Sequence, residues 1–272
     1  MISNNYVKVP LNDVVMEIVE GIWRLKDATF SKGDEVYSSI TRNNSVVRCK
    51  RDHASSSYPQ SCVRGSMIQT LIYLLSQYKH TSNKNIVFKA SEVSRLRNMA
   101  PRSENRKTLI QDLQFLSEVE MKIQHKVKNK HHETFSSLLK FRIIDHSVQV
   151  IFDSWIEAVS PNKYVEVPTE FFHFKGKRYS NTILAILKIT QLKHMAKRKL
   201  RVDSLLGYLG YDQFELHHKR LSAVKLLVTN IVNDINKVDR DVVKLAQVEF
   251  TSLLELQNTL IHITAIKKVD TS

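Results

Sequence analysis

The chain is poor in the residues that build tight turns and disulfide bonds. Among its 272 residues are only 6 glycines, 5 prolines and 2 cysteines. So little glycine and proline excludes collagen-like and low-complexity chains, and it argues against a nucleotide-binding fold built on several glycine-rich turns. The spacing of Cys49 and Cys62 matches neither a zinc site nor a CxxC redox motif. We expect two reduced thiols, and one disulfide stays open for an oxidising compartment.

Long apolar runs are also absent. No run is long enough to span a bilayer, and the first residues lack the basic segment followed by an apolar one that marks a secretory signal. A hydrophobic share of 42% is nevertheless enough to build real cores. At about 100–150 residues per domain, the length predicts two modest domains. We expect a soluble, cytoplasmic protein.

The motifs of common nucleic-acid enzymes are missing. The sequence contains no GxxxxGK[ST] loop, no HExxH pair, and no His-x-His pair with a partner tyrosine. His217-His218-Lys219-Arg220 has the HxxR spacing of tyrosine recombinases, but no tyrosine follows Tyr211 to serve as the nucleophile. His131 and His132 lack partners at the spacing of a structural metal site. We therefore expect no enzymatic activity, no cofactor and no metal.

What the chain does have is positive charge in one-sign stretches. Lys and Arg number 41 against 27 Asp and Glu, a formal net charge of +14. From Lys175 to Arg201 there are nine basic residues and no acidic one, and from Lys122 to Lys130 four lysines without an acid. A basic surface that is only solvated would contain acidic residues among the basic ones. Stretches of one sign instead suit a polyanionic partner, because counterions are released for each phosphate that a basic residue neutralises. The pattern favours nucleic acid over a membrane surface, for which an apolar face is lacking.

Apolar periodicity predicts the same succession of elements twice: a helix, a short strand, a short helix, a long helix and further strands. The predicted ranges are 67–78, 86–88, 91–99, 103–116, 121–127, 138–144 and 148–152 in the first copy, and 180–195, 199–201, 203–209, 216–235, 242–248 and 259–266 in the second. One constant shift, which places Arg106-Lys107 on Lys219-Arg220, aligns the four opening elements without a gap. We infer an internal repeat.

The residues that precede the first copy of the repeat are not part of it. A helix is expected at 11–26, and the polar stretch from there to residue 61 is expected to be loop or weak strand. YVKVP at 6–10 is similar to YVEVP at 164–168, but these two segments are farther apart than the two copies of the repeat. The first copy thus carries extra residues before its first helix. We expect an N-terminal winged-helix domain with an extended N-terminal region at 1–158, and a C-terminal winged-helix domain at 159–272.

The winged-helix assignment follows from the element order. Three helices, with a small strand after the first and a β-hairpin after the third, form this domain, and its third helix enters the DNA major groove. The expected fold class is α+β, with two tandem winged-helix domains that are helix-rich and carry small β-hairpin wings. An apolar stripe anchors each third helix, so its first turn and far face are left for phosphates and base edges.

Candidate DNA-binding residues follow from that geometry. The loop at 128–133 would be a basic wing lying along the DNA backbone, with Lys126, Lys128 and Lys130. The candidates on the two third helices are Arg102, Asn105, Arg106 and Lys107 in the first copy, and His217, His218, Lys219, Arg220, Ser222 and Lys225 in the second.

Three local patterns carry a resemblance to a known family. They are LQFLSEVEMKI at 113–123, LLKFRIIDHSVQVIF at 138–152, and RYSNTILAIL at 178–187 followed by 200–209 and by 220–236, which ends in NDIN. Over about residues 64–250 the chain resembles the iteron-binding initiator proteins of bacterial plasmid replication. Residues 28–62 and the very basic stretch at 193–199 depart from the family's pattern.

The resemblance implies a tandem winged-helix protein that binds repeated double-stranded sites in a replication origin as a monomer. It also implies a homodimer, formed largely through the first domain, that binds an inverted repeat and represses the initiator's own promoter. The host replication initiator and helicase would be its protein partners in the bacterial cytoplasm. By position, the resemblance assigns major-groove contacts to Lys219, Arg220, Ser222 and Lys225, and phosphate contacts to Lys175, Lys177 and Arg178.

Two other functions stay open at this point. One is a winged-helix transcription regulator that binds DNA without melting an origin. The other is a protein-interaction module with only non-specific affinity for DNA. The duplicated basic helices favour contacts at two half-sites over the interaction module. Repeats of about two helical turns near an AT-rich tract would indicate initiation, whereas a single palindrome at the promoter would indicate regulation.

Overall fold

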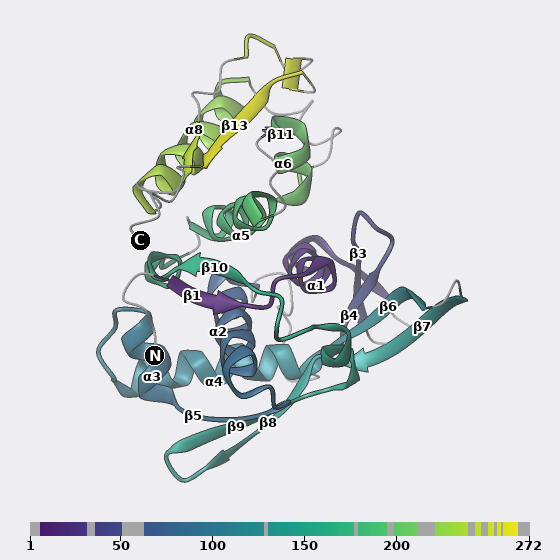
Figure 1. Ribbon diagram of the computed structural model, residues 1–272, viewed down its shortest axis with the longest axis vertical. Coiled ribbons are helices and arrows are strands. Elements are labelled where there is room, and N and C mark those ends of the chain that lie inside the picture. Colours follow the sequence, from purple (N-terminus) through teal and green to yellow (C-terminus); the bar gives the residue numbers. More distant parts are fainter. Residues whose placement is uncertain are drawn as a thin grey trace, which may run out of the picture. The chain divides into compact units, whose positions relative to one another are not determined.

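A computed structural model describes most of the chain: residues 6–31, 36–50, 63–127, 130–176, 179–194, 199–211, 221–238, 243–245, 250–252, 255–256 and 258–265. The chain divides into two compact units, Met1–Arg178 and Tyr179–Ser272, which are described separately (Figure 1). In the described part, no helix combines the length and apolar character needed to cross a bilayer.

The first unit contains a winged-helix domain. Its elements are α2 (Gly65–Thr81), β5 (Asn85–Lys89), α3 (Ala90–Leu96), α4 (Ser103–Glu118), β8 (Leu139–Ile144) and β9 (Ser147–Phe152). The three strands form an antiparallel sheet in the order β5-β9-β8. The last strand therefore lies in the middle, and the hairpin β8–β9 is the wing (Figure 1).

The second unit repeats this order. Its elements are α5 (Ser180–His194), β11 (Lys199–Arg201), α6 (Val202–Tyr208), α8 (Leu221–Val238), β12 (Val243–Leu245) and β13 (Leu260–Ala265). Its sheet has the order β11-β13-β12, which again places the last strand in the middle. The predicted α+β class with two tandem winged-helix domains is therefore confirmed.

Residues before α2 build a sheet of their own with a hairpin from farther along the chain. They form α1 (Asp13–Arg24), a short 3-10 helix (Leu25–Asp27), β2 (Thr29–Ser31), β3 (Val36–Ile40) and β4 (Val46–Lys50). These strands join β6 (Val119–Val127) and β7 (Lys130–Ser137) in the antiparallel order β2-β3-β4-β6-β7. The polar stretch expected to be loop or weak strand thus contains three strands. Their sheet depends on the pairing of β4 with β6, and β6 follows in the chain only after the three helices of the winged-helix domain.

The prediction that the loop at 128–133 is the wing of the first domain is wrong. The hairpin β6–β7, which includes the backbone of Lys126 and Lys130, extends the five-stranded sheet and does not belong to the winged-helix sheet. The wing is the following hairpin, β8–β9, because β9 pairs with β5 and β8 pairs with β9. Figure 1 shows the two hairpins as separate arms of the first unit.

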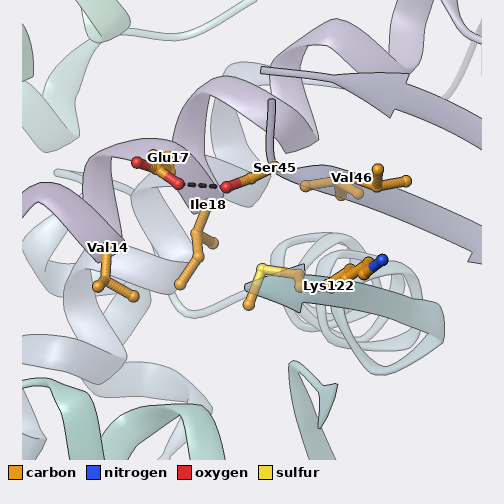
Figure 2. A pocket seen from close by; sticks show the side chains of 8 residues that line it. Val14, Glu17, Ile18, Ser45, Val46 and Lys122 are labelled. Atoms are coloured by element: carbon orange, nitrogen blue, oxygen red, sulfur yellow. Dashed lines mark hydrogen bonds between the residues drawn. The ribbon is translucent and has the colours of Figure 1, made fainter. Parts of the chain in front are cut away.

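Helix α1 packs tightly on this sheet through Gly21. A Cβ atom on Gly21 would lie only 2.1 Å from Cγ2 of Val47 in β4. The Ser39 hydroxyl in β3 donates a hydrogen bond of 2.8 Å to the Gly21 carbonyl. One turn earlier in the helix, the Glu17 carboxylate accepts a hydrogen bond from Ser45, and Figure 2 shows this contact beside Val46. A glycine is required at 21 because helix and strand approach so closely.

The two similar pentapeptides pair with each other. Strand β1 (Tyr6–Val9) is antiparallel to β10 (Val165–Pro168), with Lys8 opposite Glu166. After β10, the Gln69 side chain of α2 donates to the carbonyls of Phe171 and Phe174, at 2.7 and 3.0 Å. These contacts tie residues 165–174 to the first unit. The structure accordingly divides the chain after Arg178, and not at the expected residue 158.

A buried ion pair connects the three helices of the first winged-helix domain. The Arg97 guanidinium, just after α3, lies 3.3 Å from the Asp112 carboxylate in α4. Arg97 also donates to Thr70 Oγ1 of α2 at 2.6 Å and to the Ser66 carbonyl at 2.7 Å. The hydroxyls of Ser66 and Thr70 in turn donate to Asp112, at 2.9 and 3.0 Å. Burial raises the pKa of the Asp112 carboxyl, and the charge of Arg97 opposes this shift.

Replacing Asp112 by Leu tests the ion pair. The change leaves the buried Arg97 charge without its counter-charge, so the free energy of unfolding should fall by about 3–5 kcal/mol. Urea denaturation followed by circular dichroism measures it. The double variant Arg97→Met with Asp112→Leu removes both charges and should cost less than the single change. A double variant less stable than the single one would contradict this account.

Replacing Gly21 by Ala tests the close approach of α1 to β4. Although alanine favours a helix, its methyl group would overlap Val47, and we expect a net loss of about 1–3 kcal/mol in the free energy of unfolding. In a Val47→Ala background the 2.1 Å contact is gone and the 2.9 Å contact with Cβ of residue 47 is left, so the same change should cost less. If the cost were equal in both backgrounds, Val47 would not be the constraint.

Candidate nucleic-acid interface

The first turn of α4 and its N-cap carry the four residues predicted for the first copy. Arg102 and Lys107 are exposed, whereas Asn105 and Arg106 are half-buried. The Asn105 amide donates a 2.6 Å hydrogen bond to the Ala100 carbonyl in the connection between α3 and α4. This bond gives Asn105 a part in shaping the turn that leads into α4. The two exposed cations remain available at the surface.

Arg106 joins this helix to the wing. Its guanidinium donates to the carbonyl of Asp145, at 3.3 Å, in the turn between β8 and β9. Asp145 has a φ of 53°, in the left-handed region that a tight turn requires. The helix expected to enter the groove and the wing beside it are thus held together by a predicted DNA-binding residue.

A basic cavity lies where these elements meet. Its volume is about 370 Å³, and we call it the α4–wing cavity. Nine residues from β5, α3, the connection between α3 and α4, α4 and the wing turn line it: Lys89, Ala90, Ser91, Ser94, Pro101, Arg102, Ser103, Arg106 and His146. None is acidic. Cations and hydroxyls beside the positive end of the α4 dipole form a setting that suits a phosphate group.

Lys89, the three serines and His146 were not among the predicted DNA-binding residues. They are scattered over residues 89–146 and reach the cavity from four different elements. Lys89 stands at the end of β5 and His146 in the wing turn, and strand pairing places Lys89 opposite Ser147. The sequence predicted DNA-binding residues from basic side chains that lie close together within one helix. Only the pairing of β5 with β9 brings these side chains to Arg102 and Arg106.

Lys175, which was predicted to contact phosphate, lies in the first unit. Its ammonium group donates to the carbonyl of Asn98, at 3.1 Å, just after α3. Lys175 was expected to precede the first helix of the second copy, but residues 165–174 belong to the first unit and carry it there. Lys177 and Arg178 lie outside the described residues.

In the second unit, the structure describes two of the predicted contacts. Ser222 and Lys225 are exposed on α8, and the Lys225 ammonium lies 5.6 Å from the centre of the Phe250 ring. The apolar stripe of this helix is buried as predicted, with Val224, Val228 and Ile231 at 2% exposure or less. His217, His218, Lys219, Arg220 and Lys128 lie outside the described residues, and the side chain of Lys126 is likewise not described.

Metal-ligating side chains are not gathered in the part of the chain that the structure describes. No group of three or more His, Cys, Asp or Glu residues is placed there to hold a metal ion. Cys49 is buried in β4 and forms no disulfide bond with a described residue, and Cys62 lies outside the described residues. The chemistry of the α4–wing cavity is therefore that of cationic and hydroxyl donors.

Comparison with known proteins identifies the architecture. No family model and no curated protein sequence matches the chain. A crystal structure of domain 2 and domain 3 of RctB is similar in fold, with a TM-score of 0.53 and 8% identical residues. The match covers 92% of this chain and 98% of that one. Two consecutive domains of RctB therefore share the architecture of the two units.

Replacing Arg102 by Ala tests the α4–wing cavity. If Arg102 neutralises a phosphate, the change should weaken duplex binding and lower the slope of log affinity against log salt by about 1. Fluorescence anisotropy at several salt concentrations measures both. Lys163→Ala is the matched control, because Lys163 is an exposed lysine outside the cavity and its loss removes the same charge. Equal effects of the two changes would leave only a general charge effect.

Proposed function

We propose that the chain is a replication initiator that binds repeated sites in double-stranded plasmid DNA. The observation that carries this proposal is the presence of two winged-helix domains in one chain, each with the last strand in the middle of its sheet. The third helix of such a domain enters the major groove. Two such helices in one chain suit a repeated site about two helical turns long.

The comparisons support the same role. RctB, whose domains 2 and 3 align with 92% of this chain, is a replication initiator. The sequence patterns at 113–123, 138–152 and 178–187 resemble a different group of initiators, those that bind iterons on plasmids. Both comparisons favour an initiator over a regulator of transcription alone.

Electrostatics supports DNA as the ligand. The chain carries a formal net charge of +14, and the α4–wing cavity is lined by cations without an acid. Each phosphate that such a surface neutralises releases counterions, which drives association. In this proposal the first unit holds the backbone through Arg102, Arg106 and Lys89, while α8 of the second unit lies in the major groove.

The proposal includes partners and regulation. The monomer binds the origin repeats, and a homodimer in equilibrium with it binds an inverted repeat and represses the protein's own promoter. The host replication initiator and helicase join the origin complex in the bacterial cytoplasm. The protein acts by binding and carries out no catalytic step, so it needs neither a cofactor nor a metal.

Footprinting on the DNA that flanks the gene tests the proposal. The full chain should protect several evenly spaced sites of about two helical turns each. It should prefer them to scrambled DNA by about 10³-fold or more. A single protected palindrome would indicate a transcription regulator instead. Equal affinity for scrambled DNA, with strong salt dependence, would leave only a basic surface and contradict the proposal.

A further inference from the structure

Helix α8 exposes a leucine in the middle of its outward face. Leu226 is 61% exposed, whereas the apolar stripe on the other side of the helix is buried. Ser222, Leu226, Thr229 and Asn233 follow one another at helical spacing and are all exposed, so they share one face. Three of these four side chains are polar, and Leu226 lies among them.

This face carries no negative charge. The exposed residues of α8 are Ser222, Ala223, Lys225, Leu226, Thr229, Asn230, Asn233 and Lys237. The acid of the helix, Asp234, is turned inward: it is 8% exposed and accepts a 3.2 Å hydrogen bond from the Thr182 hydroxyl of α5. The outward face therefore offers hydroxyls, amides, two lysines and one leucine, and the helix itself exposes no acid. The Glu255 carboxylate, which follows the helix in the chain, interacts with Lys225.

The composition of this face differs from that of the α4–wing cavity. Around the start of α4, guanidinium and ammonium groups suit phosphates, which carry no sequence information. Amides and an apolar side chain instead suit base edges. In the major groove an A·T pair presents the thymine methyl group next to the N6 and N7 atoms of adenine. A leucine matches the methyl group, and an asparagine such as Asn230 matches adenine.

We propose that Leu226 contacts thymine methyl groups in the major groove and thereby makes the second winged-helix domain specific for A·T pairs. This inference rests on the proposed function, that the chain binds duplex DNA. It follows from the place of α8, the third helix of a winged-helix domain, and from the exposure of Leu226 at the centre of its outward face, which carries no acid.

A protein partner fits this face less well. Among the described residues of the second unit, Leu226 is the one large apolar side chain that is exposed. A stable protein interface buries about 800 Å² on each partner around an apolar core, and polar neighbours such as Thr229 and Asn233 do not supply one. A single apolar group among hydroxyls and amides matches the pattern of a base pair better.

Removal of single methyl groups from the DNA tests the inference. The full chain first selects duplexes from a random-sequence library, and each thymidine of the selected site is then replaced in turn by deoxyuridine, which lacks only the methyl group. We expect the wild-type affinity to fall about fourfold at one or more positions, the value of one buried methyl group. Leu226→Ala should bind the methylated site about as weakly as wild type binds the uridine site, and should no longer respond at those positions.

The matched control is Val87→Ala, which truncates an apolar side chain that is 63% exposed on β5 of the first unit. It should keep the full response to uridine. The inference is overturned if wild type shows no response at any position, if Leu226→Ala keeps it, or if Leu226→Ala changes only the mass of the free protein in sedimentation. If the library yields no preferred sequence, the proposed function itself fails, and the inference fails with it.

Discussion

The buried pair of Arg97 and Asp112 is the constraint on which the α4–wing cavity depends. Removing two charges from water is costly, and the cost is met only when both are hydrogen-bonded, here also by Ser66 and Thr70. The contacts of this pair join α2, α3 and α4. That arrangement sets where the first turn of α4 emerges, and so where Arg102 and Arg106 face the wing. The gap-free shift that the sequence suggested between the two copies is wrong for the third helix, because it places the buried Leu109, Leu113 and Leu116 of α4 on the exposed Ser222, Leu226 and Thr229 of α8.

The second domain joins the corresponding helices differently. There Asp234 of α8 accepts a hydrogen bond from the Thr182 hydroxyl of α5. The two domains have thus kept one backbone order and changed their polar contacts. One surface gathers cations around a cavity, and the other presents a helix face on which amides, hydroxyls and a leucine lie beside two lysines. Holding the backbone and reading bases need these different chemistries, because phosphates are alike at every step and base edges are not.

The N-terminal sheet shows how the fold departs from two plain copies. The hairpin β6–β7 is inserted between α4 and β8, and it pairs with β4, so an extended N-terminal region is attached to the first domain. Strand β1 likewise pairs with β10. Helix α1, expected at 11–26, forms at Asp13–Arg24, since its apolar positions repeat at helical spacing. Strands β2, β3 and β4 are short, and they are stabilised by partners that no local pattern reveals.

The sequence by itself determined the helices of both domains and their winged-helix order, because apolar periodicity is a local property of the chain. Leu113 and Val224, for instance, are buried in the helices where periodicity placed them. Only the tertiary structure decided that β8–β9 is the wing, that Lys175 lies in the first unit, and that Lys89 and His146 join Arg102. The physical reason is that these features depend on strand pairing and packing between segments far apart in the chain, which short-range patterns do not encode.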